Sequence, residues 1–249
     1  MDEKTFKKRR SSSSNDVFEF YDEYAETWDT RFGKTESVVE FHKKRLKNFL
    51  ELAELSKDEV AAELGVGTGP YVQDIAPLVK KLICVDGSRG MLDVLKSKVK
   101  NLDNVVLQQI DLSKPIKKTD IKADVLFFFG LIEHIIDMDT LIENCKLMLN
   151  EGARVIAISS NAASPWYYGV RKLARAGSHL TTDKYYSRRT LGKVMREHGF
   201  EEVDYRYWGF YPAGIEGIGY QFLRWLGDIL EHSPLKILAG GMTIRYRLK

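Results

Sequence analysis

An acidic residue followed by three closely spaced glycines is the first stretch of the sequence that could do chemistry. The apolar run 60–62 ends at Glu63, and glycines follow at the alternate positions Gly65, Gly67 and Gly69. The next residue is a proline, whose fixed φ and missing N–H suit the first position of a helix. Glycines let a backbone approach a ligand closely, and N–H groups at a helix start point toward it. The stretch therefore predicts a strand that turns sharply into a helix beside a bound molecule.

Two cofactor classes compete for this glycine loop, and a purely structural turn is the third alternative. A dinucleotide-binding loop, Gly-x-Gly-x-x-Gly, would need its third glycine at position 70. That position holds Pro70, and the third glycine comes one residue earlier, at Gly69. The pattern Glu-x-Gly-x-Gly-x-Gly instead resembles motif I of the class I S-adenosylmethionine (SAM)-dependent methyltransferases. The resemblance implies that Glu63 lies near the amino-acid end of SAM, with the glycines under its amino-acid and ribose portions.

A second buried strand also ends in a carboxylate. Asp86 stands at its tip, where an acid can accept both ribose hydroxyls of either a nicotinamide cofactor or SAM. Gly87 and Ser88 then lead into a helix predicted over 89–98, with Met91 on its first turn. The resemblance implies that Met91 packs on the adenine, although it could equally be a core residue.

The third predicted strand, 104–108, is followed by Asp111 and Leu112. In the resembling family an acid at this place hydrogen-bonds the adenine amino group. Acids are common in polar loops, so Asp111 alone is weak evidence for adenine binding. It becomes a stronger candidate because Glu63 and Asp86 precede it at the ends of two other strands. The three acids in this order favour SAM as the ligand.

The apolar run 123–129 predicts a central parallel strand, and the reaction centre should follow it directly. Ligands in open α/β sheets bind beyond the carboxyl ends of the strands, so Phe129, Gly130 and His134 should lie where substrate and cofactor meet. The pair Glu133-His134 resembles the ubiquinone-biosynthesis O-methyltransferases and related small-molecule enzymes. His134 is the candidate general base, and Glu133 could orient it. Alternatively, His134 only caps the helix that follows.

The N-terminal residues divide into a tail and a pair of helices. Residues 1–15 carry a basic patch and four consecutive serines with almost nothing to bury, so they are expected to be disordered. Helices are expected within 16–56, and segment 20–29 resembles the N-terminal helix that folds over the cofactor in small-molecule methyltransferases. The resemblance implies a lid, although these aromatic side chains could simply pack on the sheet. The residues expected to close over the site are Tyr21, Tyr24 and Trp28, and Tyr24 is also expected to contact the cofactor.

Arg45 lies on the second of these helices, predicted over 36–55 from apolar residues at helical spacing. In related enzymes a basic residue near this position reaches the carboxylate of the cofactor. The alternative is that Arg45 belongs to a solvated helix face.

Five strands alternate with helical segments up to residue 160, which requires a parallel, doubly wound sheet. A helix is expected over 185–198, then a sixth strand over 200–207 and a seventh over 242–248. In the resembling family the last strand is antiparallel and the strand order is 3-2-1-4-5-7-6. The expected fold is a Rossmann-like, seven-stranded, mostly parallel α/β sheet with helices on both faces, in a single domain over 16–249.

A long connection, about 208–241, joins the last two strands and predicts a functional insertion. Within it, six apolar residues fall on one helix face: Ile218, Phe222, Trp225, Leu226, Ile229 and Leu230. This face could cap the substrate cleft or pair with a second subunit. The sharper hypothesis is peripheral membrane contact through 215–230 and the aromatic, basic segment 166–175.

Composition argues against several classes of protein. The net charge of +3 is too small to argue for nucleic acid as a partner. No run of about 18 apolar residues could span a membrane, and the charged N-terminus is unlike a secretory signal. Cys84 and Cys145 stand in apolar surroundings, so both are expected to be reduced in a cytoplasmic protein. The five histidines lack the spacing of a metal site.

Together these patterns predict a SAM-dependent methyltransferase that produces S-adenosylhomocysteine (SAH). The expected acceptor is a small molecule, with a lipophilic one as the sharper alternative, and the expected acceptor atom is oxygen. Nitrogen, carbon or sugar acceptors are the first alternatives, and an NAD-binding Rossmann oxidoreductase is the second. The protein is expected to act as a monomer or homodimer.

Overall fold

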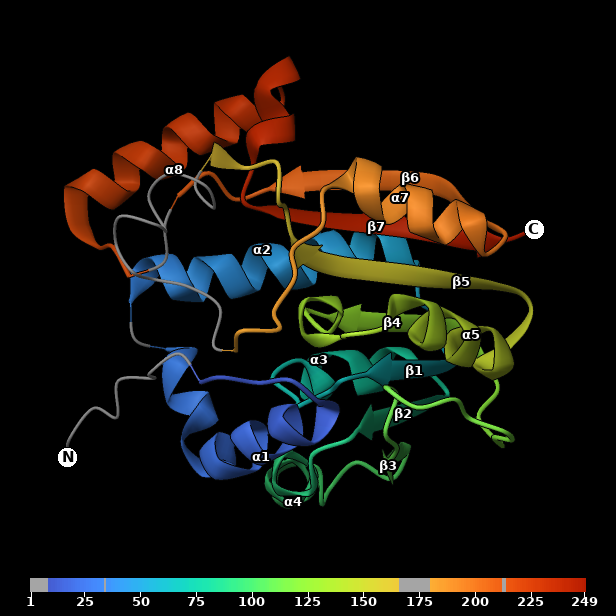
Figure 1. The fold of residues 1–249 in the computed structure, drawn as a ribbon. Coiled ribbons are helices and arrows are strands. Elements are labelled where there is room, and N and C mark those ends of the chain that lie inside the picture. Colours follow the sequence, from blue (N-terminus) through green and yellow to red (C-terminus); the bar gives the residue numbers. More distant parts are fainter. Residues whose placement is uncertain (1–8, 34, 166–179, 212–213) are drawn as a thin grey trace.

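A seven-stranded sheet runs through the protein, whose computed structural model describes residues 9–33, 35–165, 180–211 and 214–249. The strands are β1 (Val60–Leu64), β2 (Lys81–Asp86), β3 (Val105–Gln109), β4 (Ala123–Phe129), β5 (Leu149–Ser160), β6 (Phe200–Trp208) and β7 (Gly241–Leu248). Their order is β3-β2-β1-β4-β5-β7-β6, stacked from β6 at the top to β3 at the bottom of Figure 1. Strands β1 to β5 pair in parallel, and β7 is antiparallel to both β5 and β6. The predicted topology is confirmed.

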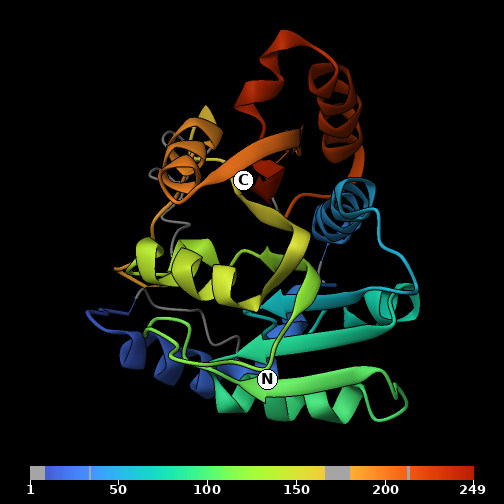
Figure 2. The ribbon, with the colours of Figure 1, turned by 90° about the vertical axis from the view of Figure 1, so that its right-hand side faces the viewer.

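Helices cover both faces of this sheet (Figure 2). Packed against one face are α5 (Met138–Met148) and α7 (Arg188–Glu197). Packed against the other are α2 (Glu36–Ala53), α3 (Val72–Ile75) and α4 (Arg89–Lys98). Short 3-10 turns complete this part of the chain: η2 (Ala76–Leu78) and η3 (Ile132–His134). Helix α7 begins later than residue 185 because the Ser187 side chain caps it.

The central strand β4 explains why two cores form. Its side chains alternate, with Val125 and Phe127 in the core under α2 to α4, and Leu126 and Phe128 in the core under α5 and α7. A strand buried on both faces must be apolar throughout, as this one is. Cys84 and Cys145 are buried and unpaired, in one core each, which confirms them as core residues.

The N-terminal tail ends earlier than the sequence suggested. Residues 9–15, expected to be disordered, contact the body of the protein: the Ser11 N–H donates to Thr181 Oγ1 at 2.9 Å. Helix α1 (Ser14–Tyr24) begins after Ser13, whose hydroxyl accepts from the Asp16 N–H. The side chain of Asp16 accepts from the Ser13 N–H in return, so Ser13 and Asp16 form a capping box.

The predicted insertion forms α8 (Gly217–Glu231) and the 3-10 turn η5 (Pro234–Leu238), between β6 and β7. Its apolar face is turned away from the chain: Ile218 is 86% exposed, and Phe222 and Trp225 are each 58% exposed. The buried residues of α8 are Tyr220 and Gly227. The helix therefore neither buries its apolar stripe in the sheet nor uses it to seal the cleft. Among the helices of the described residues, none is both long and apolar enough to cross a membrane.

Candidate active site

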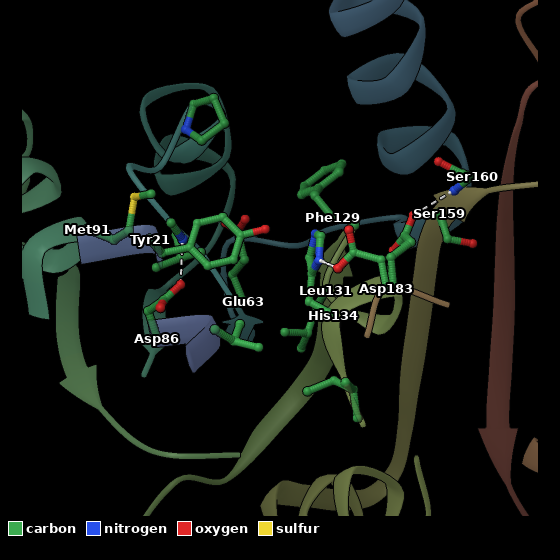
Figure 3. A pocket seen from close by; sticks show the side chains of 18 of the residues that line it. Tyr21, Glu63, Asp86, Met91, Phe129, Leu131, His134, Ser159, Ser160 and Asp183 are labelled. Carbon is green, nitrogen blue, oxygen red and sulfur yellow. Dashed lines mark hydrogen bonds and ion pairs between the residues drawn. The ribbon is translucent and has the colours of Figure 1, made fainter. Parts of the chain in front are cut away.

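A cavity of about 570 Å³ lies at the carboxyl ends of the parallel strands. Residues that follow β1, β2 and β4, and the last residues of β5, form its wall: Gly65, Gly87, Gly130, Ser159 and Ser160. Residues of α1 and of the 3-10 turn η1 (Ala25–Arg31) cover it, with Tyr21 and Trp28 in the lining. Figure 3 shows Asp86 and Met91 on one side of this space, and His134, Asp183 and Ser159 on the other. The sheet thus assembles the site at the edge where the sequence placed it.

The three glycines of the loop after β1 all adopt positive φ: +68° at Gly65, +56° at Gly67 and +67° at Gly69. L-residues rarely adopt this conformation, which explains their spacing. Gly65 and Gly67 line the cavity. Gly69 is not part of the cavity wall, and its bare Cα packs against Leu95 of α4. The third glycine is therefore needed for packing between the loop and a helix.

Asp86 is held by the backbone around it. Its carboxylate accepts from the Gly67 N–H and from the Ser88 N–H, both at 2.8 Å. Burial raises the pKa of Asp86, and these hydrogen bonds oppose that shift. Ser88 caps α4 by accepting from the Met91 N–H, and it stands behind the cavity wall, whereas Met91 lines the cavity.

Glu63 and Arg45 lie on the cavity wall between the two sides of the site. Glu63 is 1% exposed, and its Oε2 has no hydrogen-bond partner among the described residues. Burial raises the pKa of Glu63 to about 8, against the opposing effect of the Arg45 charge. The guanidinium of Arg45 lies 5.3 Å from the ring centre of Phe129. Arg45 therefore faces the site, and the alternative of a solvated helix face is excluded.

Two predicted cofactor residues, Asp111 and Tyr24, do not line the cavity. Asp111 accepts from the Ser113 N–H at 3.0 Å and pairs with Lys114 at 2.8 Å, and it is absent from the cavity lining although its neighbours Ile110 and Leu112 belong to it. Tyr24 stands outside the wall with its ring 4.9 Å from that of Phe20. Adenine recognition by Asp111 and cofactor contact by Tyr24 stay predictions.

His134 forms a pair with a residue that the sequence did not reveal. Its Nδ1 lies 2.8 Å from Oδ1 of Asp183, whose side chain is fully buried. An ionised carboxylate can only accept, so Nδ1–H donates and Nε2 is left to accept a proton. Asp183 Oδ2 in turn accepts from the Leu180 N–H at 3.1 Å. The pair has the geometry of a base and its orienting partner.

The next helix does not depend on His134. Asp137 caps α5, and its side chain accepts from the Asp139 and Thr140 N–H groups. His134 therefore does not cap this helix. Glu133 does not orient the imidazole either, because its Oε1 accepts from the Ser160 N–H at 2.9 Å.

Two acids that the sequence patterns did not single out tie the N-terminal helices to the glycine loop and α4. Asp22 accepts from the Gly90 N–H at 2.8 Å, at the start of α4. Asp29 accepts from the Thr68 hydroxyl at 2.6 Å, inside the glycine loop. These contacts hold α1 and η1 over the cavity. No local sequence motif identifies either acid, because each accepts a hydrogen bond from a residue that is distant in the sequence.

Two further sequence predictions concern the basic segment 166–175 and metal binding. Segment 166–175 lies outside the described residues. Within the described ranges, no group of three or more His, Cys, Asp and Glu side chains is placed to hold a metal ion.

Known proteins share the fold described above. Residues 62–155 match the model of a methyltransferase domain. A search of curated proteins found no match. The N-methyltransferase NodS from Bradyrhizobium japonicum, solved with SAH, is similar at 16% identity over 95% of this chain and 99% of that one, with a TM-score of 0.60. A possible histamine N-methyltransferase from Thermotoga maritima is similar at 17% identity over 94% and 100%, with a TM-score of 0.66.

A third similar structure is the [4+2]-cyclase SpnF, at 13% identity over 97% of this chain and 99% of that one, with a TM-score of 0.67. Because a cyclase shares this architecture, similarity of fold does not by itself decide the reaction. The matched methyltransferase domain runs from β1 to β5 and includes the glycine loop and the residues after β4. Residues 62–155 thus carry a methyltransferase domain, and the strand order of the whole chain is the one that the class I resemblance implied.

Proposed function

We propose that the protein transfers the methyl group of SAM to an oxygen atom of a small acceptor, with His134 as the general base. The observation that carries this proposal is the His134–Asp183 pair on the cavity wall. In the reaction the acceptor oxygen forms a bond to the methyl carbon while the bond from sulfur to that carbon breaks. The hydroxyl proton passes to His134 Nε2, and SAH leaves as a neutral thioether.

The proposed position of SAM follows from the charges along the wall. The ammonium group of SAM is assigned to Glu63, whose buried Oε2 lacks a partner among the described residues, and its carboxylate to Arg45. The ribose hydroxyls are assigned to Asp86, and the adenine to the space between Met91 and Leu112.

Alignment supplies most of the remaining catalysis. A nucleophile held about 3–3.5 Å from the methyl carbon reacts without the entropy cost of an encounter. Tyr21 and Trp28 line the cavity from above, and their rings pack at 5.1 Å between centres. Tyr21 also meets the ring of His134 edge-on, at 5.4 Å. In this proposal the covering aromatics keep water from the sulfonium and restrain the imidazole.

Replacing Asp183 with Asn tests the proposed base. Asn cannot stabilise the imidazolium that forms when His134 takes the proton, so kcat should fall about 10²-fold near neutral pH, within the range for acid–base catalysis. The loss should shrink at high pH, where a phenolic acceptor ionises without help. Asp139→Asn is the matched control, because Asp139 pairs with the surface residue His198 at 2.9 Å. A uniform loss at every pH would contradict the positioning role of Asp183.

A second candidate is transfer to nitrogen, favoured by the likeness to NodS, an N-methyltransferase, and to the possible histamine N-methyltransferase from Thermotoga maritima. An unprotonated amine needs no base before it attacks the methyl carbon. Product analysis with methyl-labelled SAM separates the two candidates, because only an oxygen acceptor should make turnover depend strongly on the His134–Asp183 pair.

The affinity for SAH should depend on pH through Glu63. In the unliganded protein the pKa of Glu63 is raised from 4.5 to about 8, so its contribution to stability is present below 4.5 and lost as the pH rises to about 8. A cofactor ammonium beside Glu63 favours the ionised form, so binding releases a proton below pH 8. Affinity measured by calorimetry should then rise up to about tenfold per pH unit between pH 6 and 7 and level off above 8. Glu63→Gln should flatten this profile, and a profile unchanged by that substitution would contradict the assignment.

We also propose that the exposed stripe of α8 rests on an anionic lipid surface. Its acids Asp228 and Glu231 turn away from the stripe toward Lys44 on α2, at 2.7 and 2.8 Å, while Arg224 is exposed on the same helix. Apolar side chains beside an exposed cation are typical of helices that lie in a membrane interface.

Co-sedimentation with vesicles that contain phosphatidylglycerol tests this contact. Trp225→Asp should abolish binding, and Gln221→Asp, which adds the same charge at another exposed position of the helix, should weaken it far less. A second copy of the chain on the stripe would give a dimer that Trp225→Asp dissociates, with no binding to vesicles. That result would contradict the membrane proposal.

A further inference from the structure

The wall of the cavity carries more acidic than basic side chains. Within the described part of the chain, four carboxyl groups line it together with one guanidinium and the imidazole of His134: Glu63, Asp86, Glu133, Asp183 and Arg45. Such a wall favours cationic ligands and opposes anionic ones, since charges in a site of low dielectric interact strongly. The sulfonium cofactor fits this preference, and an acid that the cofactor does not occupy is open to the acceptor.

Three of the four acids already have a role under the proposed function. Glu63 and Asp86 are assigned to the ammonium and ribose groups of SAM, and Asp183 accepts from the His134 imidazole at 2.8 Å. Arg45 is assigned to the cofactor carboxylate. Glu133 has no assigned ligand.

Glu133 is buried with half of its carboxylate unused. It is 5% exposed, and its Oε1 accepts from the Ser160 N–H at 2.9 Å. Its Oε2 has no hydrogen-bond partner among the described residues. The hydroxyl of Ser159 is also buried without a hydrogen-bond partner: the residue is 3% exposed, and its Oγ has no partner in the described ranges. Both residues line the cavity, and leaving a buried polar atom without a hydrogen-bond partner costs free energy.

Gly130 lies between Glu133 and Arg45, the residue assigned to the cofactor carboxylate. Its φ is +72°, and a Cβ built there would lie 2.7 Å from Arg45 Nη2 and 3.9 Å from Glu133 Oε2. Arg45 and Glu133 thus flank one residue but form no ion pair within 4.0 Å of each other among the described contacts. The free oxygen of Glu133 is left to a ligand.

We propose that Glu133 and Ser159 bind a protonated amine of the methyl acceptor. This inference rests on the proposed function and names its substrate class: a small amine with an apolar body and a hydroxyl that reaches His134. Phe41, Phe129 and Trp208 line the same cavity and would enclose the apolar body. An amine held as an ammonium ion has no free lone pair, so it anchors the acceptor while the hydroxyl oxygen attacks.

The test compares three phenols that differ in the charge of the side chain, using SAH-loaded protein and calorimetry. Tyramine is cationic, 4-ethylphenol is neutral and 3-(4-hydroxyphenyl)propionate is anionic. Tyramine should bind at least about tenfold more tightly than 4-ethylphenol, and the propionate should bind most weakly. Glu133→Gln keeps an oxygen for the Ser160 N–H and should erase the advantage of tyramine. Ser159→Ala should reduce that advantage, and Glu197→Gln, at the end of α7, should leave it unchanged.

Binding of SAH is measured first for every variant. This measurement separates a failure of the proposed function from a failure of the amine site alone. If the unmutated protein fails to bind SAH, the proposed function is contradicted, and the amine site falls with it. If SAH binds, the amine site is contradicted by an absence of tyramine binding, by equal affinities for tyramine and 4-ethylphenol, or by an advantage that survives Glu133→Gln.

Discussion

Replacing His134 with Ala should lower kcat for methyl transfer to a hydroxyl acceptor by about 10²–10⁴-fold, the usual contribution of a positioned base. The imidazole is fixed by Asp183 at 2.8 Å and by the edge of the Tyr21 ring, so its free nitrogen has a defined direction. The acceptor proton would otherwise go to water, which Tyr21 and Trp28 are proposed to exclude. Steady-state rates with labelled SAM measure the effect.

The affinity for SAH should not change in the same variant, because Glu63, Asp86 and Arg45 are assigned to the cofactor. His198→Ala is the control: this histidine also meets two acids, Asp139 and Glu143, but on the surface, at 2.9 and 2.8 Å. Its pKa is raised by those hydrogen bonds, yet it lies outside the cavity wall. Full turnover by His134→Ala at neutral pH, with SAH affinity retained, would show that His134 is not the proton acceptor.

Gly65→Ala should weaken SAH binding by about 10²-fold. The residue has a φ of +68°, and an added Cβ would lie 2.6 Å from Leu131 Cδ1. A non-glycine residue in this region costs about 1–2 kcal/mol, and forcing an extra methyl into a packed site costs about 1–3 kcal/mol. The loop must shift to relieve the backbone strain and the clash with Leu131. Its backbone then no longer lies where it would contact the cofactor. Calorimetry with SAH measures the change.

Gly152→Ala supplies a matched control for backbone strain. Gly152 has a φ of +75°, a Cβ added there would meet no atom of the described residues within 4 Å, and the residue is not part of the cavity wall. This variant should lose thermal stability through its conformation alone and bind SAH normally. Equal SAH affinities for Gly65→Ala and Gly152→Ala would mean that the glycine loop does not contact the cofactor.

The part of the site that the sequence predicted is the part built at strand ends. Glu63, Asp86 and Gly130 each follow an apolar run, and parallel strands bring their carboxyl ends to one edge of a sheet. The strand order came from the family resemblance, and the structure confirms it. Positive φ at Gly65, Gly67 and Gly69 explains why glycines recur at this spacing in the loop.

The parts that the sequence did not predict depend on contacts between distant segments. Asp183 meets His134 from 49 positions further along the chain, in a stretch without a motif. Asp22 and Asp29 likewise act on loops that only the folded chain brings near. Helical spacing identified α8 correctly, but periodicity shows that a face is apolar and cannot show whether the chain covers it.

Titration of the folded protein with SAH, and separately with NAD⁺, tests the central claim most directly. The buried carboxylate of Glu63, the glycine loop with its early third glycine and Asp86 are proposed to form a SAM site. Calorimetry should therefore show saturable, one-to-one binding of SAH and no binding of NAD⁺ at the same concentrations. Folded protein that binds NAD⁺, or that shows no heat with SAH, would contradict the assignment of the cavity to SAM.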